Sequence, residues 1–127
     1  MILIVDDDAG MTEACSMLLE AHGFQVNIAA SAAEALAKMK ETSHDLVISD
    51  CAMPGMSGLE LSQTLKADPG TAAVPVLLIS ASLRCDIAQG SSYESFLRKP
   101  FLAENLLVEV RKLLSVGGPA SPSPMKA

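Results

Sequence analysis

Residues 45–58, with the sequence DLVISDCAMPGMSG, constrain the fold of this chain more than any other stretch. Residues 46–48 are all apolar, the run stops at Asp50, and residues 53–55 (Met-Pro-Gly) favour a loop. A short run that is apolar throughout is typical of a parallel strand buried on both faces. An acid at the carboxyl end of such a strand lies where open α/β sheets bind their ligands. A lone aspartate there also fits a residue that caps a turn, so the rest of the chain has to decide.

Four other short segments indicate strands. Residues 1–5 are apolar and lead directly into three consecutive acids, and residues 74–79 form a second apolar run that ends at Ser80. Residues 96–97 form a short run before Lys99. Residues 24–28 alternate between apolar and polar, which is typical of a half-exposed edge strand.

Helical patterns separate these strands. The sequence predicts capping boxes at Ser31 with Glu34 and at Ser57 with Glu60. Gly23 is placed to end the first helix. The last helix is predicted to have one apolar face and to carry its cations in its final turn, where the macrodipole favours them; the face is Leu102, Leu106, Val110 and Leu113, and the cations are Arg111 and Lys112. Residues 82–93 are poor helix material because residues 90–92 are Gly-Ser-Ser.

Five strands alternating with helices predict an α/β fold with a doubly wound five-stranded parallel sheet. The edge character of the second strand favours the flavodoxin-like order 2-1-3-4-5, with a short or irregular fourth helix. A chain of 127 residues is long enough for one domain with its own core. We expect that domain over residues 1–116 and a flexible tail or truncated linker over the Gly/Pro/Ser-rich residues 117–127.

Charge and composition exclude several classes of function. A net charge of -6 argues against a nucleic-acid surface, which would be basic. No apolar run approaches the ~18 residues that a membrane span needs, and no secretory leader is recognisable. The chain's three cysteines lack metal or redox spacing, so we expect reduced thiols in a cytoplasmic protein.

Four of the predicted strands end in residues that suit one reaction. These residues are Asp6 and Asp7 together, Asp50, Ser80 and Lys99. Clustered carboxylates repel one another unless a cation joins them, and hard oxygen ligands suit Mg²⁺. A carboxylate can attack phosphorus, while a cation, a hydroxyl and an ammonium neutralise the phosphoryl oxygens. Taken alone, the acids also fit a helix cap, the serine a turn and the lysine a surface residue.

Taken together, the motifs resemble the receiver domain of two-component response regulators over residues 1–115. The matching stretches are ILIVDDD, DLVISDCAMPGMSGLEL, VPVLLISAS and FLRKPF, in this order. The resemblance implies a phosphorylation-controlled switch whose phosphoacceptor is Asp50. It implies that Asp7, supported by Asp6, holds Mg²⁺ together with Asp50 and the backbone carbonyl of Ala52. The implied phosphodonor is a phosphohistidine of a sensor histidine kinase or phosphotransfer protein.

The resemblance also implies how the signal leaves the domain. Ser80 would turn toward the phosphoryl group, Lys99 would pair with one of its oxygens, and Phe96 would be the switch aromatic. The partner-binding face would then change for a downstream output domain or protein. Such a domain phosphorylates and slowly dephosphorylates itself rather than turning over a substrate. Phe96 also fits an ordinary apolar strand residue.

Two other functions remain open at this point. One is a receiver-like interaction module that works without phosphorylation. The other is a phosphatase of the haloacid dehalogenase type, because Asp6 and Asp8 after the first strand resemble its nucleophile motif. That enzyme needs a further acidic pair after the lysine, where this chain offers only Glu104 and Glu109 on an amphipathic helix.

Overall fold

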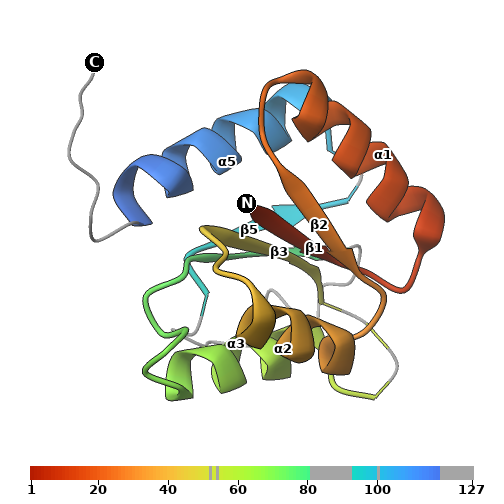
Figure 1. The fold of residues 1–127 in the computed structure, drawn as a ribbon. Helices are drawn as coiled ribbons and strands as arrows, with labels where there is room; N and C mark the ends of the chain where they lie inside the picture. The colour runs from red at the N-terminus through yellow and green to blue at the C-terminus, as the bar shows by residue number, and fades with distance from the viewer. Residues whose placement is uncertain (52, 54, 81–92, 100, 118–127) are drawn as a thin grey trace.

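The computed structural model describes residues 1–51, 53, 55–80, 93–99 and 101–117. These residues form a five-stranded parallel sheet in the order β2-β1-β3-β4-β5, as predicted (Figure 1). The strands are β1 (Ile2–Val5), β2 (Val26–Ala29), β3 (Leu46–Asp50), β4 (Val76–Ser80) and β5 (Ser95–Arg98). The helices are α1 (Ala9–Ala21), α2 (Ala32–Glu41), α3 (Gly58–Ala67) and α5 (Ala103–Gly117). The predicted short or irregular fourth helix lies outside the described residues.

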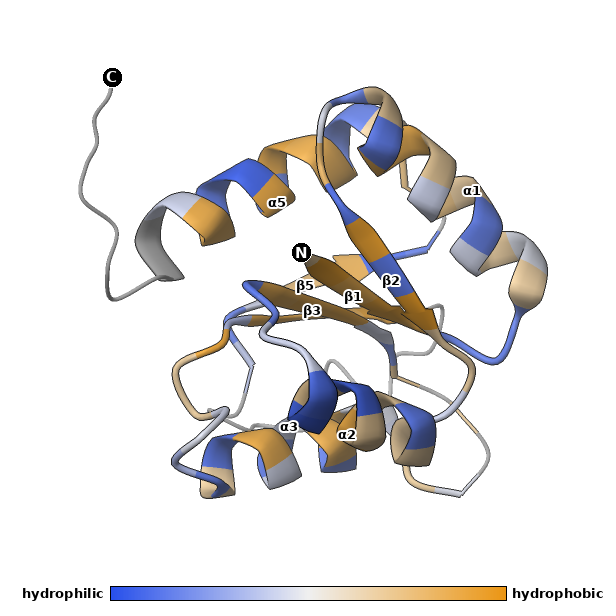
Figure 2. Cartoon of the chain, viewed as in Figure 1, coloured by the Kyte–Doolittle hydropathy of each residue, from blue (hydrophilic) through white to orange (hydrophobic). Residues whose placement is uncertain are grey.

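The sheet separates two hydrophobic layers. Helices α1 and α5 cover one face, and α2 and α3 cover the other (Figure 1). Neighbouring residues of β1 enter different layers, Ile2 and Ile4 on the α1/α5 side and Leu3 and Val5 on the α2/α3 side. This alternation requires strands that are apolar at every position, and the central strands are the most hydrophobic part of the ribbon in Figure 2.

The helix starts follow the predicted capping residues, with one difference. Ser57 and Glu60 form a complete capping box at α3, as predicted. At α2 the Ser31 hydroxyl accepts from the backbone N–H of Glu34, but the Glu34 carboxylate accepts from Ala30 instead of Ser31. The predicted box at α2 is therefore only half formed. Gly23, with φ 92°, follows the last residues of α1 as predicted.

The last helix differs from the prediction at both ends. Leu102 is 62% exposed and precedes the helix, so it is wrong as a member of the buried face, whereas Leu106, Val110 and Leu113 are buried. The helix continues to Gly117, which places Arg111 and its neighbour before the last turn. Periodicity marks the face of a helix but not its ends, because adjacent loop residues can continue the pattern by chance. The tail was predicted over residues 117–127, but Gly117 is still part of α5, and residues 118–127 lie outside the described residues.

A charged side chain sets the position of β5 beside β4. The Glu94 carboxylate accepts from the backbone N–H of Val76 at 2.7 Å and pairs with the Lys66 ammonium at 2.8 Å. The Lys66 ammonium also donates to the carbonyl of Val74 at 2.8 Å. These bonds join the end of α3 to the starts of β4 and β5, so they help to fix the register that places Lys99 at the opposite end of β5.

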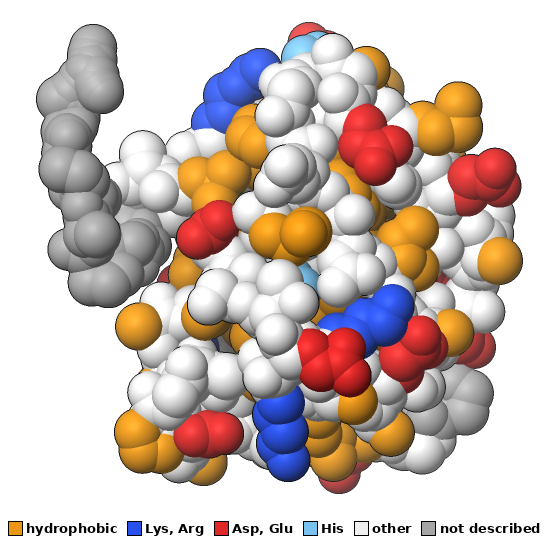
Figure 3. All heavy atoms as spheres, viewed as in Figure 1, with side chains coloured by type: hydrophobic (Ala, Val, Ile, Leu, Met, Phe, Trp, Pro, Cys, Tyr) orange, Lys and Arg blue, Asp and Glu red, His pale blue; other side chains and the backbone are white. Residues whose placement is uncertain are grey.

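The charged side chains are mixed on the face of the molecule drawn in Figure 3. No helix among the described residues is long and apolar enough to cross a membrane. On the face drawn in Figure 3, basic side chains are interspersed with acidic and neutral ones. A nucleic-acid-binding surface would gather basic side chains instead, so this face agrees with the acidic net charge of the chain.

His44 is buried beside β2 without a full set of hydrogen bonds. Its Nε2 atom lies 3.4 Å from the amide nitrogen of Asn27, and its Nδ1 atom has no well-formed hydrogen bond among the described residues. Burial lowers the pKa of the His44 imidazole below its usual 6.5. The folded protein therefore favours the neutral ring.

We predict that His44→Leu makes the protein less sensitive to acid. As the pH falls through the usual histidine pKa, the unfolded wild type takes up a proton that the folded state resists, so its free energy of unfolding decreases. The variant lacks this loss and, without the unpaired nitrogen, gains about 1 kcal/mol already at pH 7. Urea unfolding at pH 7 and pH 5 measures the difference in the free energy of unfolding between His44→Leu and the wild type. His22→Leu, at the exposed end of α1, is the control. A difference that is no larger at pH 5 than at pH 7 would contradict the prediction.

Candidate functional site

The carboxyl ends of β1, β3, β4 and β5 form one edge of the sheet. Asp50 is the last residue of β3 and pairs in register with Ile79, next to Ser80 at the end of β4. The backbone N–H of Lys99 donates to the carbonyl of Ser80 at 2.9 Å, and that of Asp6 donates to Ala29 at 3.1 Å. The sheet's own hydrogen bonds therefore bring the predicted residues of four strands together.

Three carboxylates meet at this edge. One oxygen from each of Asp6, Asp7 and Asp50 lies within 4.8 Å of the others. Asp6 is buried, Asp50 is partly buried and Asp7 is exposed. At such separations the like charges repel, and water screens the repulsion least at the buried group.

Lys99 faces two of these acids. Its ammonium nitrogen lies 3.7 Å from Oδ2 of Asp6 and 3.5 Å from Oδ1 of Asp50. Both distances exceed those of a good charge-assisted hydrogen bond, so one cation compensates the cluster only in part. Its position leaves it able to contact a further anionic group beside Asp50.

Asp6 shows the electrostatic consequence. Burial raises the pKa of the Asp6 carboxyl, and the charges of Asp50 and Asp7 raise it further. The backbone N–H of Asp8 and the ammonium of Lys99 oppose that rise in pKa without cancelling it. The ionised form of Asp6 is thus less favourable in the folded protein than in the unfolded chain.

The donor set fits a hard divalent cation. Carboxylate oxygens are the ligands that Mg²⁺ prefers, and an exposed side such as that of Asp7 leaves room for coordinated water. Asp6, Asp7 and Asp50 could supply the protein ligands. Ala52, expected to add its backbone carbonyl, lies outside the described residues.

Ser80 lies on β4, the neighbour of the strand that carries Asp50, and Phe96 lies on β5, the strand beyond it. Ser80 is fully buried at the end of β4. Phe96 is half-buried in β5, pairs in register with Leu78 and packs against the hydrophobic layer on the α2/α3 side. These positions are compatible with the expected roles of both residues, which stay predictions.

The further acids that a haloacid dehalogenase would need lie away from the carboxylate cluster of the described residues. The Asp8 side chain caps α1 by accepting from Gly10 and Met11. Glu109 accepts a 2.6 Å hydrogen bond from the Ser95 hydroxyl, and Glu104 is exposed in the first turn of α5. None of these three belongs to the carboxylate cluster formed by the described residues.

Gly58 is a site residue that the sequence analysis did not single out. A Cβ atom at this position would lie 2.2 Å from the Asp50 carbonyl oxygen and 2.9 Å from the Cα atom of Cys51. The Gly58 backbone N–H donates to the Cys51 carbonyl at 2.9 Å. The start of α3 therefore packs directly against the backbone of Asp50. The signal available in the sequence was a glycine directly after the helix cap Ser57.

The cysteines differ from the prediction in part. Cys15 is a free, buried thiol, as expected. Cys51, directly after Asp50, is disulfide-bonded, so the prediction of a reduced thiol is wrong for this residue. Cysteine count and spacing cannot show which sulfur atoms the fold brings together. The sulfur to which Cys51 is bonded lies outside the described residues.

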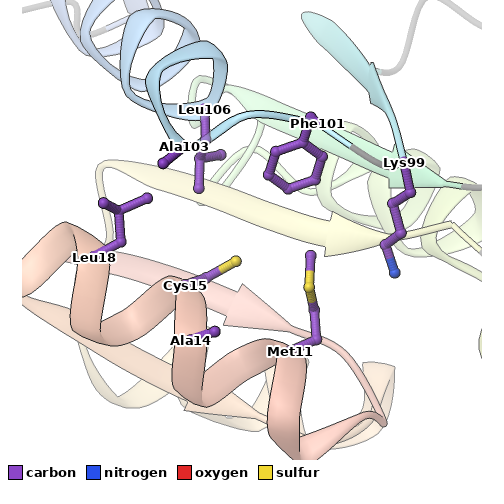
Figure 4. A pocket seen from close by; sticks show the side chains of 8 residues that line it. All are labelled: Met11, Ala14, Cys15, Leu18, Lys99, Phe101, Ala103 and Leu106. Carbon is purple, nitrogen blue, oxygen red and sulfur yellow. The ribbon is translucent and has the colours of Figure 1, made fainter.

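An apolar cavity of about 620 Å³ lies beside the acidic cluster, between α1 and α5 (Figure 4). It is lined by Met11, Ala14, Cys15, Leu18, Lys99, Phe101, Ala103 and Leu106. Lys99 belongs to both places, because its stem lines the cavity while its ammonium faces the carboxylates. Apolar residues thus surround the aliphatic part of Lys99, whose ammonium partly compensates the charge of the cluster.

Comparisons with known proteins agree on one family. Residues 2–111 match the response regulator receiver domain. The chain is 34% identical over 116 residues to the DNA-binding response regulator MtrA of Mycobacterium tuberculosis, covering 89% of this chain and 50% of that protein. It is 32% identical over 121 residues to the phosphate regulon transcriptional regulatory protein PhoB of Pseudomonas aeruginosa, covering 93% of this chain and 53% of that protein. The chain thus spans about half the length of the curated relatives it matches.

Solved structures show the same similarity. The signal receiver domain of a histidine kinase from Syntrophus aciditrophicus superposes with a TM-score of 0.86 at 32% identity, covering 99% of this chain and 97% of that one. The response regulator TrrA of Thermotoga maritima, solved in complex with Mg²⁺ and BeF, gives a TM-score of 0.79 at 31% identity, covering 88% of this chain and 96% of that one.

We predict that Asp6→Asn raises the melting temperature when divalent cations are chelated. The amide keeps an acceptor for the Asp8 N–H but removes a buried charge whose ionisation the fold disfavours. Differential scanning calorimetry in EDTA at pH 7 measures the change, and Glu13→Gln on the exposed side of α1 controls for net charge. If Asp6→Asn and Glu13→Gln have the same melting temperature, the rise does not come from relieved repulsion in the carboxylate cluster, and the prediction is wrong.

Gly58→Ala should destabilise the fold by roughly 1–3 kcal/mol, because the added methyl overlaps the Asp50 backbone and α3 must shift. Gly70→Ala is the matched control, since its Cβ would meet Asp68 at an ordinary 3.5 Å. Chemical denaturation of both variants gives the two free energies. The packing argument fails if the two substitutions cost the same.

Proposed function

Because this chain belongs to the receiver domain family of response regulators, we propose that it is a switch in which Asp50 accepts a phosphoryl group. The phosphodonor is a phosphohistidine of a sensor histidine kinase or phosphotransfer protein. The observation that carries this proposal is the position of Lys99 opposite the cluster of Asp6, Asp7 and Asp50. It places one cation and three acids around a single point at the open edge of the sheet.

In the proposed reaction, a carboxylate oxygen of Asp50 attacks phosphorus. An O–P bond forms and the P–N bond of the donor breaks, its electron pair remaining on the imidazole nitrogen. The Lys99 ammonium, 3.5 Å from Asp50, neutralises charge on a phosphoryl oxygen. Asp7, Asp6 and Asp50, with Ala52 as a further expected ligand, would hold a Mg²⁺ ion that would supply more positive charge there.

The signal is then passed through the neighbouring strands. We propose that the Ser80 hydroxyl turns toward the phosphoryl group and that Phe96, now half-buried, packs further inward. Lys99 follows β5 directly and is bonded through its backbone to Ser80, so both strands sense the same new charge. The partners of the changed face are a downstream output domain or a separate protein.

This function differs from that of a turnover enzyme. The DNA-binding response regulator MtrA and the transcriptional regulatory protein PhoB are about twice as long as the part matched here. We propose that this chain contributes signal reception without touching nucleic acid. It phosphorylates itself from the donor and slowly loses the group by hydrolysis. A receiver-like module that never accepts phosphate is less well supported, because the acids and Lys99 converge at the sheet edge.

We predict one added phosphoryl group when the protein is incubated with acetyl phosphate and Mg²⁺, and none when Mg²⁺ is chelated. Intact-mass measurement follows the reaction. Asp50→Asn should abolish labelling, whereas Asp45→Asn, just before the other end of the same strand, should not change it. Labelling of Asp50→Asn at the wild-type level would overturn the assignment, and sustained phosphate release from p-nitrophenyl phosphate would favour a phosphatase.

A further inference from the structure

Asp8 is the one member of the acidic run that stays outside the carboxylate cluster of the described residues. Its side chain is turned to α1, where Oδ1 accepts from the backbone N–H of Gly10 at 3.0 Å and of Met11 at 3.3 Å. Its carbonyl also accepts from the N–H of Thr12 at 3.1 Å. Asp8 is thus the N-cap of α1 and is held in an extended conformation, with φ −91° and ψ 104°.

The backbone of the same residue contacts the site. The N–H of Asp8 donates to Oδ1 of Asp6 at 2.9 Å. The other oxygen of Asp6, Oδ2, lies on the side of Lys99, 3.7 Å from its ammonium. One hydrogen bond therefore determines which oxygen of the buried Asp6 faces the loop and which faces the cluster.

The two sets of bonds are mechanically connected. The side-chain cap fixes the dihedral angles of Asp8 relative to the first turn of α1, and those angles fix the direction of its N–H. Without the cap, the first turn of the helix frays and the N–H no longer has one preferred direction. Asp6 is 5% exposed, so it has little water to replace that donor.

We propose that Asp8 is a positioning residue for the cation site: through the cap of α1 it orients Asp6 toward the cation without binding the cation itself. This inference rests on the proposed function, because it concerns the affinity of the same site for Mg²⁺. Residues that hydrogen-bond to metal ligands commonly change metal affinity by about 10- to 100-fold when they are removed.

Side-chain substitutions at Asp8 separate the cap from the charge. Asparagine caps a helix as well as aspartate and serine nearly as well, whereas alanine provides no acceptor. We expect Asp8→Ala to weaken Mg²⁺ binding roughly tenfold. Asp8→Asn and Asp8→Ser should weaken it only a few-fold, as expected for the loss of one exposed charge. Isothermal titration calorimetry with MgCl₂ measures the affinities, and no phosphodonor is needed.

A second helix of the same chain provides the matched control. Ser31 caps α2 by accepting from the N–H of Glu34 at 3.1 Å. Ser31→Ala removes a cap of the same kind at a helix start whose capping residue does not bond to any of the three clustered acids. It should lower stability by a similar amount and leave Mg²⁺ affinity unchanged.

Each outcome bears on the proposal. Tenfold weaker binding in Asp8→Ala, restored in Asp8→Asn, supports it. Equal losses in Asp8→Ala and Asp8→Asn would mean that charge alone matters, and an unchanged affinity in Asp8→Ala would mean that the cap does not reach the site; either result overturns it. If Asp8→Ala does not fold, Asp8→Ser is compared with Asp6→Ala, and equally low Mg²⁺ affinities of these two variants overturn the proposal as well.

The experiment also separates this inference from the proposed function. If the wild type does not bind Mg²⁺, the cation site and this inference fail together. If the wild type binds Mg²⁺ and Asp8→Ala binds it equally well, only this inference fails.

Discussion

The repulsion among Asp6, Asp7 and Asp50 is the constraint to which the rest of the structure responds. Backbone hydrogen bonds of the sheet force these carboxylates to one edge, although nothing in their own interactions favours it. Lys99 offsets the repulsion only in part, because its ammonium stays 3.5 Å or more from the acids. A bound cation would stabilise a site whose negative charge is under-compensated in this way.

Burial of the two hydrophobic layers offsets the free-energy cost of this repulsion. β1, β3 and β4 are buried on both faces, so the sheet is held by apolar contacts with all four described helices. Glu94 and Lys66 fix the far ends of β4 and β5, and Gly58 lets α3 approach the Asp50 backbone. The strand ends therefore stay together even where the charges on them repel.

Three consecutive aspartates after β1 end in three different environments. Asp6 is buried under the site, Asp7 is exposed at its edge, and Asp8 turns away to cap α1. The chain passes from strand to helix within these residues, so each successive side chain points in a different direction. A nucleophile motif formed by Asp6 and Asp8 therefore fits the sequence but not the structure. The Asp8 carboxylate accepts hydrogen bonds from the backbone N–H groups of Gly10 and Met11 instead of facing the site.

Local sequence patterns and the general rules of parallel sheets were enough to predict the strand order, the edge at which the acids and Lys99 meet, and the capping box at Ser57. The sequence predicted the face of α5 correctly except for Leu102, and it failed at the end of that helix because periodicity carries no stop signal. Only the tertiary structure showed the close approach of Gly58 to Asp50, the orphaned nitrogen of His44, the disulfide at Cys51 and the bond from Asp8 to Asp6. Each of these depends on the distance between atoms of different elements or on the direction of one peptide group. Such distances and directions arise only when the whole chain has packed.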